Sequence, residues 1–158
     1  MRPASYLFFI FAAFSAFGQK SEDLPSDFLS GDFHHDRRVE LRKSLPENSV
    51  AVFFANPVRN RSNDVDYTYH QDPDFYYLTG YKEANAVLFI FKEKQTAANG
   101  QQYDEILFVQ PRDALRELWN GRTLGEEGTK RRVGFEQAFN NIEFQKYNVE
   151  FTKFDRIL

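Results

Sequence analysis

The stretch NAVLFIFKEKQTAANGQQYDEILFVQ, residues 85–110, decides the fold class. It contains two apolar runs of strand length, 85–93 and 103–110, separated by a polar segment with an Asn99–Gly100 pair. Continuous apolar runs bounded by turn residues are typical of strands that are buried on both faces. An Asn-Gly pair favours the tight turn that joins antiparallel strands. The stretch therefore predicts a buried β-hairpin.

A helix is predicted before this hairpin. Residues 34–45, HHDRRVELRKSL, place Val39, Leu41 and Leu45 on one side and basic residues on the other, and the helix should stop before Pro46. A second, short helix is predicted over 113–121, DALRELWNG, with Asp113 as its N-cap. Its inward side chains are expected to be Leu115, Leu118 and Trp119.

The remaining segments complete an alternating pattern. The apolar run VAVFFA, 50–55, predicts another buried strand, and the polar residues 58–66 predict a loop. Residues 126–141 predict one helix or two short ones, and 147–154 are expected to form a final strand. Alternating helices and strands predict an α/β domain with a mixed β-sheet flanked by helices.

The N-terminus has the features of an export signal. Arg2 precedes a short apolar run, and small residues at Ala16 and Gly18 fit a cleavage site. The run is shorter than the ~20 apolar residues of a membrane span, although an uncleaved anchor is the alternative. We therefore expect a signal peptide over 1–18, a linker over 19–33 and a domain over 34–158. The mature protein should be exported, periplasmic or extracellular, with no membrane attachment after cleavage.

Composition excludes several kinds of site. The 158 residues contain no cysteine, which rules out disulfides, thiolate metal sites and cysteine nucleophiles. The formal net charge of −3 argues against a nucleic-acid-binding surface, which needs clustered Lys and Arg. No complete hydrolase or phosphate-binding motif occurs in the sequence.

Two clusters carry residue types that bind metals: His34-His35-Asp36 and His70-x-Asp72-x-Asp74. Adjacent side chains on a helix point about 100° apart, so the first cluster cannot easily share one ion. In the second, Pro73 favours a turn over the regular strand that would align the three ligands. We expect neither cluster to bind a metal.

The aromatic stretch 67–81, YTYHQDPDFYYLTGY, is interpreted as a structural corner. Asp72 and Asp74 should cap a short helical turn that Gly80 ends. The side chains expected to point inward are Phe75, Tyr77 and Leu78.

Two blocks, residues 53–90 and 108–128, occur in the order and spacing of a known family. The first block contains three short motifs: Arg61-Ser62-x-Asp64, Tyr67-x-Tyr69-x-Gln71 and Asp74-Phe75-Tyr76-Tyr77-Leu78-Thr79-Gly80. The second is FVQPRDALRELWNGRTLGEEG. With these residues the chain resembles the N-terminal domain of the aminopeptidase P (Xaa-Pro aminopeptidase) family. It departs from the family pattern at His70, where arginine is usual, and at Pro73, where serine or asparagine is common.

The resemblance implies a creatinase N-terminal, or ribonuclease H-like, fold. It also implies a parent enzyme that cleaves before proline in proline-containing peptides, with two metal ions, typically manganese (Mn2+), in a C-terminal catalytic domain that this chain lacks. The five metal ligands of the family lie in that domain, so this chain should hold no catalytic or metal-binding residue and be inactive alone. The parent protein is expected to be a homo-oligomer.

By the same resemblance, Asp64 and Trp119 occupy positions that reach toward a neighbouring subunit's active site in oligomeric relatives. Arg122 is a third candidate, which could pair with a carboxylate across that interface. The alternatives are a turn-capping aspartate, a core tryptophan and an ordinary surface arginine. Two other readings of function stay open: the N-terminal part of an Xaa-Pro dipeptidase, or a stand-alone binding or assembly domain.

Overall fold

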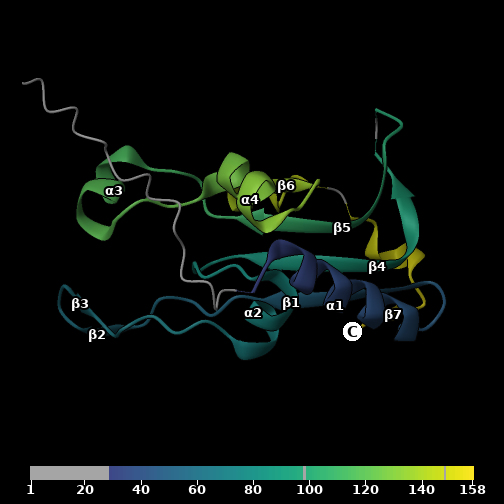
Figure 1. Cartoon of the computed structure of the whole chain (residues 1–158), viewed down its shortest axis with the longest axis horizontal. Coiled ribbons are helices and arrows are strands. Elements are labelled where there is room, and N and C mark those ends of the chain that lie inside the picture. The colour runs from purple at the N-terminus through teal and green to yellow at the C-terminus, as the bar shows by residue number, and fades with distance from the viewer. Residues whose placement is uncertain (1–28, 98, 148) are drawn as a thin grey trace, which may run out of the picture.

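The computed structural model describes residues 29–97, 99–147 and 149–158, whose centre is a five-stranded mixed sheet (Figure 1). In spatial order the strands are β6 (Ala138–Asn140), β5 (Gln102–Val109), β4 (Val87–Thr96), β1 (Ser49–Phe54) and β7 (Arg156–Ile157). The three central strands pair antiparallel, whereas β6 and β7 each add in parallel at an edge. The predicted mixed sheet flanked by helices is confirmed.

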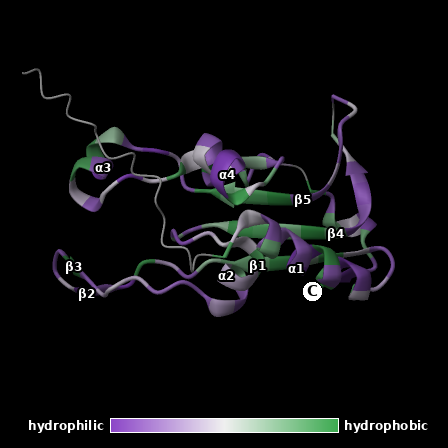
Figure 2. Ribbon diagram, viewed as in Figure 1, coloured by the Kyte–Doolittle hydropathy of each residue, from purple (hydrophilic) through white to green (hydrophobic). Residues whose placement is uncertain are grey.

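The β4–β5 hairpin forms as the sequence predicts, and its strands lie inside this sheet, between β6 and β1. Gly100 adopts a left-handed backbone with φ of 83° in the turn. Successive side chains of β4 point to opposite faces, with Leu88 and Ile90 in one core and Phe89 and Phe91 in the other. Both faces are buried, which explains why the strand reads as a continuous apolar run; Figure 2 shows the hydrophobic colour concentrated in β1, β4 and β5.

Helix α1 (Gly31–Ser44) lies against one face of the sheet (Figure 1). It begins three residues before the expected start, because the Ser30 hydroxyl accepts a hydrogen bond from Phe33 N at 3.3 Å. Its fully buried side chains are His34 and Arg38, whereas the expected Val39 and Leu41 are only partly buried. The prediction of an apolar inner side was therefore wrong in part.

Arg38 can be buried because its charge is matched. Its Nε and Nη2 atoms donate to the two carboxylate oxygens of Glu105 on β5, each at 2.8 Å, and Nη1 donates to Leu78 O at 2.8 Å. The guanidinium carbon lies 4.0 Å from the ring centroid of Phe135. A bidentate ion pair of this kind replaces the hydration that the charge loses on burial.

The opposite face is covered by residues 141–147 and 149–154. Two short 3₁₀ turns, Asn141–Glu143 and Phe151–Lys153, hold aromatic side chains over the sheet. Phe144 lies 5.8 Å from Phe89, and Tyr147 lies 5.3 Å from Phe108, between ring centroids. The strand predicted over 147–154 is thus wrong: this segment contains a 3₁₀ turn, and the strand that follows is β7.

The helix prediction over 126–141 also needs correction. Helix α4 (Gly125–Val133) ends at Gly134, which is left-handed with φ of 82°. The chain then extends and adds β6 beside β5. A strand of three residues is too short for its periodicity to stand out beside a helix.

Most of the N-terminal prediction lies outside the described residues. The expected signal peptide, 1–18, and residues 19–28 of the expected linker belong to that part. Within the described residues, no helix is long and apolar enough to cross a bilayer.

Candidate functional site

The aromatic corner forms as the sequence predicts, with one exception. Asp72 caps helix α2 (Pro73–Thr79) by accepting a hydrogen bond from Phe75 N at 2.9 Å, and Gly80 ends the helix in a left-handed conformation. Phe75 and Leu78 are buried, but Tyr77 is 48% exposed. The inward prediction for Tyr77 was wrong because residues 75, 78 and 79 already form the buried side of this short helix.

Helix α2 is fixed to α1 by His34. Its Nδ1 lies 2.8 Å from Tyr77 O, and since a carbonyl only accepts, Nδ1 carries the proton. Burial lowers the pKa of His34, which favours the neutral ring that this contact uses. The other side of the ring lies against Gly80.

Gln71, directly before α2, joins four segments through one side-chain amide. Its Oε1 accepts hydrogen bonds from Asn56 N, Asp72 N and the Tyr69 hydroxyl at 2.9–3.1 Å. Its Nε2 donates to Tyr81 O at 3.2 Å and to Glu83 O at 2.9 Å. Gln71 is 8% exposed, and these bonds replace the water that its amide loses on burial.

A hairpin begins where a loop was predicted. Strands β2 (Asn60–Ser62) and β3 (Val65–Asp66) pair antiparallel, and Asn63 turns the chain with φ of 49°. Asp64 lies at this turn and is exposed. The loop prediction for 58–66 failed because every one of these residues is exposed, so no apolar pattern marks the strands.

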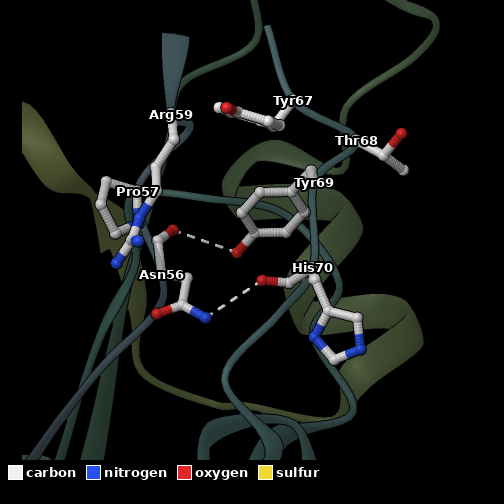
Figure 3. Close-up of a pocket in the computed structure, with 7 residues that line it drawn as sticks. All are labelled: Asn56, Pro57, Arg59, Tyr67, Thr68, Tyr69 and His70. Carbon is white, nitrogen blue, oxygen red and sulfur yellow. Dashed lines mark hydrogen bonds between the residues drawn. The ribbon is translucent and has the colours of Figure 1, made fainter. Parts of the chain in front are cut away.

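A hollow of about 280 Å³ lies at the base of the hairpin (Figure 3). Its lining residues are Asn56, Pro57, Arg59, Tyr67, Thr68, Tyr69 and His70. The Tyr69 hydroxyl shares its one proton between Gln71 Oε1, at 2.9 Å, and Asn56 O, at 3.1 Å, and Asn56 Nδ2 donates to His70 O at 3.1 Å. These bonds hold the returning arm of the hairpin against the end of β1.

Helix α3 (Ala114–Asn120) forms where it was predicted, with Asp113 as its N-cap. Its orientation is the reverse of the prediction, because Leu115, Leu118 and Trp119 are 75%, 79% and 89% exposed. Figure 1 shows the reason: α3 projects beyond the sheet, so no sheet face lies beneath it. An amphipathic pattern identifies one side of a helix but not what covers that side.

The side of α3 that faces its own loop carries Glu117. The Glu117 carboxylate accepts two hydrogen bonds from Arg112, at 2.8 and 2.7 Å, and one from the Thr123 hydroxyl at 2.9 Å. The bonds from Arg112 lower the pKa of Glu117 to about 2. The helix is therefore supported from within the loop while its apolar side faces solvent.

The three site residues predicted from the sequence lie on two segments. Asp64 is at the tip of the β2–β3 hairpin, and Trp119 and Arg122 are at the end of α3; all three are exposed. Both segments project from the same end of the molecule (Figure 1). The alternative of a core tryptophan is wrong. The grouping of Asp64, Trp119 and Arg122 into one binding surface stays a prediction.

Neither metal-like cluster gathers around one point. His34 is buried against α2, whereas His35 and Asp36 are exposed; Asp72 caps α2. Among residues 29–97, 99–147 and 149–158, no three His, Asp or Glu side chains converge as a metal site requires.

Comparison with known proteins identifies the family that has this architecture. Residues 34–156 match the family described as "Aminopeptidase P, N-terminal domain". The chain belongs to this family. Aminopeptidase P relatives include the Xaa-Pro aminopeptidase of Haemophilus influenzae, 36% identical over 109 residues that cover 69% of this chain and 24% of the relative. The Xaa-Pro aminopeptidase of Escherichia coli is 36% identical over 115 residues, covering 72% of this chain and 25% of the relative.

Solved structures of the family have the same fold. Aminopeptidase P from E. coli with the inhibitor Pro-Leu superposes with a TM-score of 0.70 at 30% identity, covering 82% of this chain and 28% of that one. The aminopeptidase PepP of Pseudomonas aeruginosa superposes with a TM-score of 0.66 at 33% identity, covering 75% and 26%. This chain thus spans about a quarter of the length of these aminopeptidase P proteins.

Proposed function

We propose that the chain is the N-terminal, non-catalytic domain of a secreted, metal-dependent Xaa-Pro aminopeptidase. Such an enzyme removes the N-terminal residue that precedes proline. The names of the relatives and the match over residues 34–156 support this assignment. Peptide-bond cleavage would be performed by the rest of the parent protein, and this domain would shape the entrance to the active site and help build the oligomer.

One observation carries the role of this domain: the exposed apolar side of α3. Leu115, Leu118 and Trp119 form it at 75–89% exposure, although Arg112 and Glu117 hold the helix in a defined position. An exposed apolar patch on a well-supported element is typical of an interaction site, and tryptophan is a favoured anchor there. The neighbouring hairpin, with Asp64 at its tip, would extend the same surface.

The metal of the proposed enzyme would be bound outside the described residues. Within them, no three His, Asp or Glu side chains converge as a metal site requires. We propose manganese as the metal, held by the parent's catalytic domain, where it would activate a water for attack on the bond before proline.

The test is the substitution Trp119→Ala in the full-length parent protein. We expect kcat/KM for a tripeptide with proline second to fall about tenfold, since an interface anchor typically contributes more than 1 kcal/mol. Light scattering should show dissociation of the oligomer. Stability should change little, because Trp119 is 89% exposed within the chain.

Ile142→Ala is the matched control, since Ile142 is also apolar and 68% exposed but lies outside α3 and the hairpin. It should leave both readouts unchanged. An unchanged kcat/KM and mass in Trp119→Ala would contradict the proposed role. Comparing a dipeptide with the tripeptide separates an aminopeptidase from an Xaa-Pro dipeptidase.

A further inference from the structure

Both ends of the α3 loop meet at the side chain of Glu83. The loop, residues 111–123, leaves the domain after Gln110 and returns at Leu124. Glu83 Oε1 accepts a hydrogen bond from Leu124 N at 2.7 Å, and Oε2 accepts one from Gln110 Nε2 at 3.4 Å. One carboxylate therefore closes the base of the whole loop.

The same residue also fixes the hairpin. The backbone oxygen of Glu83 accepts a hydrogen bond from Gln71 Nε2 at 2.9 Å. Gln71 in turn holds Asn56 and Tyr69, the two residues between which the hairpin leaves and rejoins the domain. Glu83 is thus the point at which the supports of both projecting segments meet.

The Glu83 carboxylate is itself held in one orientation. Its Oε2 accepts a hydrogen bond from the hydroxyl of Tyr81 at 2.8 Å, and Tyr81 is fully buried. Burial and the nearby carboxylate raise the pKa of Tyr81, so the hydroxyl keeps its proton and remains a donor. A side chain with both oxygens engaged has few other rotamers available.

The other bonds near α3 differ in kind. Arg112, Glu117 and Thr123 bind one another inside the loop. They shape α3 but join loop residues only to loop residues. At the loop's return point, the Leu124 side chain packs against the core, and the bond from Leu124 N to Glu83 is a polar contact that joins this point to a residue outside the loop.

We propose that Glu83 is a positioning residue, whose carboxylate sets the orientation of α3, with Trp119, on the domain. It acts through Gln110 and Leu124 and touches no reacting atom. The consequence for substrate entry rests on the function proposed above, whereas the effect on loop motion is a property of this chain alone.

The first test measures loop motion in the 158-residue chain carrying Glu83→Ala. The loop contains Arg112, Arg116 and Arg122, so trypsin cleavage within it, identified by mass spectrometry, reports its opening. We expect cleavage about tenfold faster than in the unaltered chain, because the closed loop loses the stabilisation of one hydrogen bond to a charged acceptor. The fluorescence anisotropy of Trp119, the only tryptophan in the sequence, should fall.

Two further variants separate positioning from simple destabilisation. Glu105→Gln weakens the buried ion pair of Arg38, so it should lower the melting temperature. It should leave the anisotropy of Trp119 and the rate of trypsin cleavage within the loop unchanged. Glu83→Gln retains an oxygen that can accept from Leu124 N and should restore most of the protection. Unchanged cleavage and anisotropy in Glu83→Ala, or equal effects in Glu105→Gln, would overturn the proposal.

The second test uses the full-length parent enzyme. Glu83→Ala should raise KM for the tripeptide about tenfold with a smaller change in kcat, because substrate entry is affected more than chemistry. If Trp119→Ala leaves activity intact while Glu83→Ala still loosens the loop, the proposed function fails and the positioning role stands. If Trp119→Ala lowers activity but Glu83→Ala neither loosens the loop nor raises KM, the positioning role fails and the proposed function stands.

Discussion

Because Gly80 has no Cβ atom, helices α1 and α2 can pack closely at this position. The residue is left-handed with φ of 69°, and a Cβ atom there would lie 2.6 Å from His34 Cδ2. Because His34 also donates to Tyr77 O, its ring cannot move away without losing a buried hydrogen bond. Glycine is therefore required at position 80 for two reasons: the backbone is left-handed, and the His34 ring leaves no room for a Cβ atom.

We predict that Gly80→Ala destabilises the domain by about 2–4 kcal/mol, the sum of left-handed strain and overpacking. Gly100→Ala is the matched control: its φ is 83°, but a Cβ atom there would meet nothing within 4 Å. It should cost only the strain, about 1–2 kcal/mol. Urea denaturation of both variants measures the difference, and equal losses would refute a role for the His34 contact.

Glu117 makes the α3 loop sensitive to acid. Its pKa of about 2 in the folded loop lies below the ordinary value of 4.5, so the ionised form is favoured by folding. The stabilisation is fully present above about pH 4.5 and is lost as the pH falls toward 2. We predict that the anisotropy of Trp119 falls across this window.

Arg112→Ala provides the check, because hydrogen bonds from Arg112 are the main cause of the lowered pKa of Glu117. This variant should move the midpoint of the anisotropy change upward, toward pH 4.5. A midpoint that stays the same in the variant would mean that another group controls the transition.

At the scale of elements, α1 depends on a charge inside the domain. Arg38 is fully buried, and Glu105, its partner on β5, also accepts a hydrogen bond from Arg42 at 3.1 Å. We predict that Arg38→Met costs about 3–5 kcal/mol, because it leaves the Glu105 carboxylate without its main partner. Urea denaturation measures the loss.

The double variant Arg38→Met with Glu105→Leu should recover a large part of that loss, since two apolar side chains can replace a buried ion pair at little net cost. The coupling between the two substitutions is read from a double-mutant cycle. Purely additive losses would show that the pair does not act as a unit.

The length and burial of each element decide whether the sequence could predict it. β1, β4 and β5 were found because a strand buried on both faces needs apolar residues throughout, whatever its partners are. β6 and β7, with three and two residues, are too short for any period to be read. The pattern of α3 was correct, but its exposed side depends on neighbours that lie outside the helix.

The long-range partners of polar side chains were the other failure. Arg38, Gln71 and Glu83 each bind a partner far away in the sequence, at 67, 10 and 41 positions respectively. Local periodicity does not encode such partners, so an Arg in a helix was assigned to the solvent side. A polar residue at a position where spacing expects a core residue was the available signal at Arg38, which lies four positions after His34 and seven before Leu45.

At the scale of the whole molecule, two segments project from one end of a sheet whose faces are both covered (Figure 1). Helices cover one face of the sheet and aromatic residues of 141–154 cover the other, so the core is closed on both faces. The hairpin and α3 project from one end (Figure 1). Asp64 on the hairpin and Trp119 on α3 are both exposed, and our proposal assigns this end an interaction surface.

The most direct measurement is the manganese-dependent release of the N-terminal residue from a tripeptide with proline second. It should be made on the full-length parent protein and on this chain alone, at equal concentration. We predict cleavage before proline by the parent protein and none by the chain alone. Cleavage by the isolated chain, or a parent protein with no activity before proline, would contradict it.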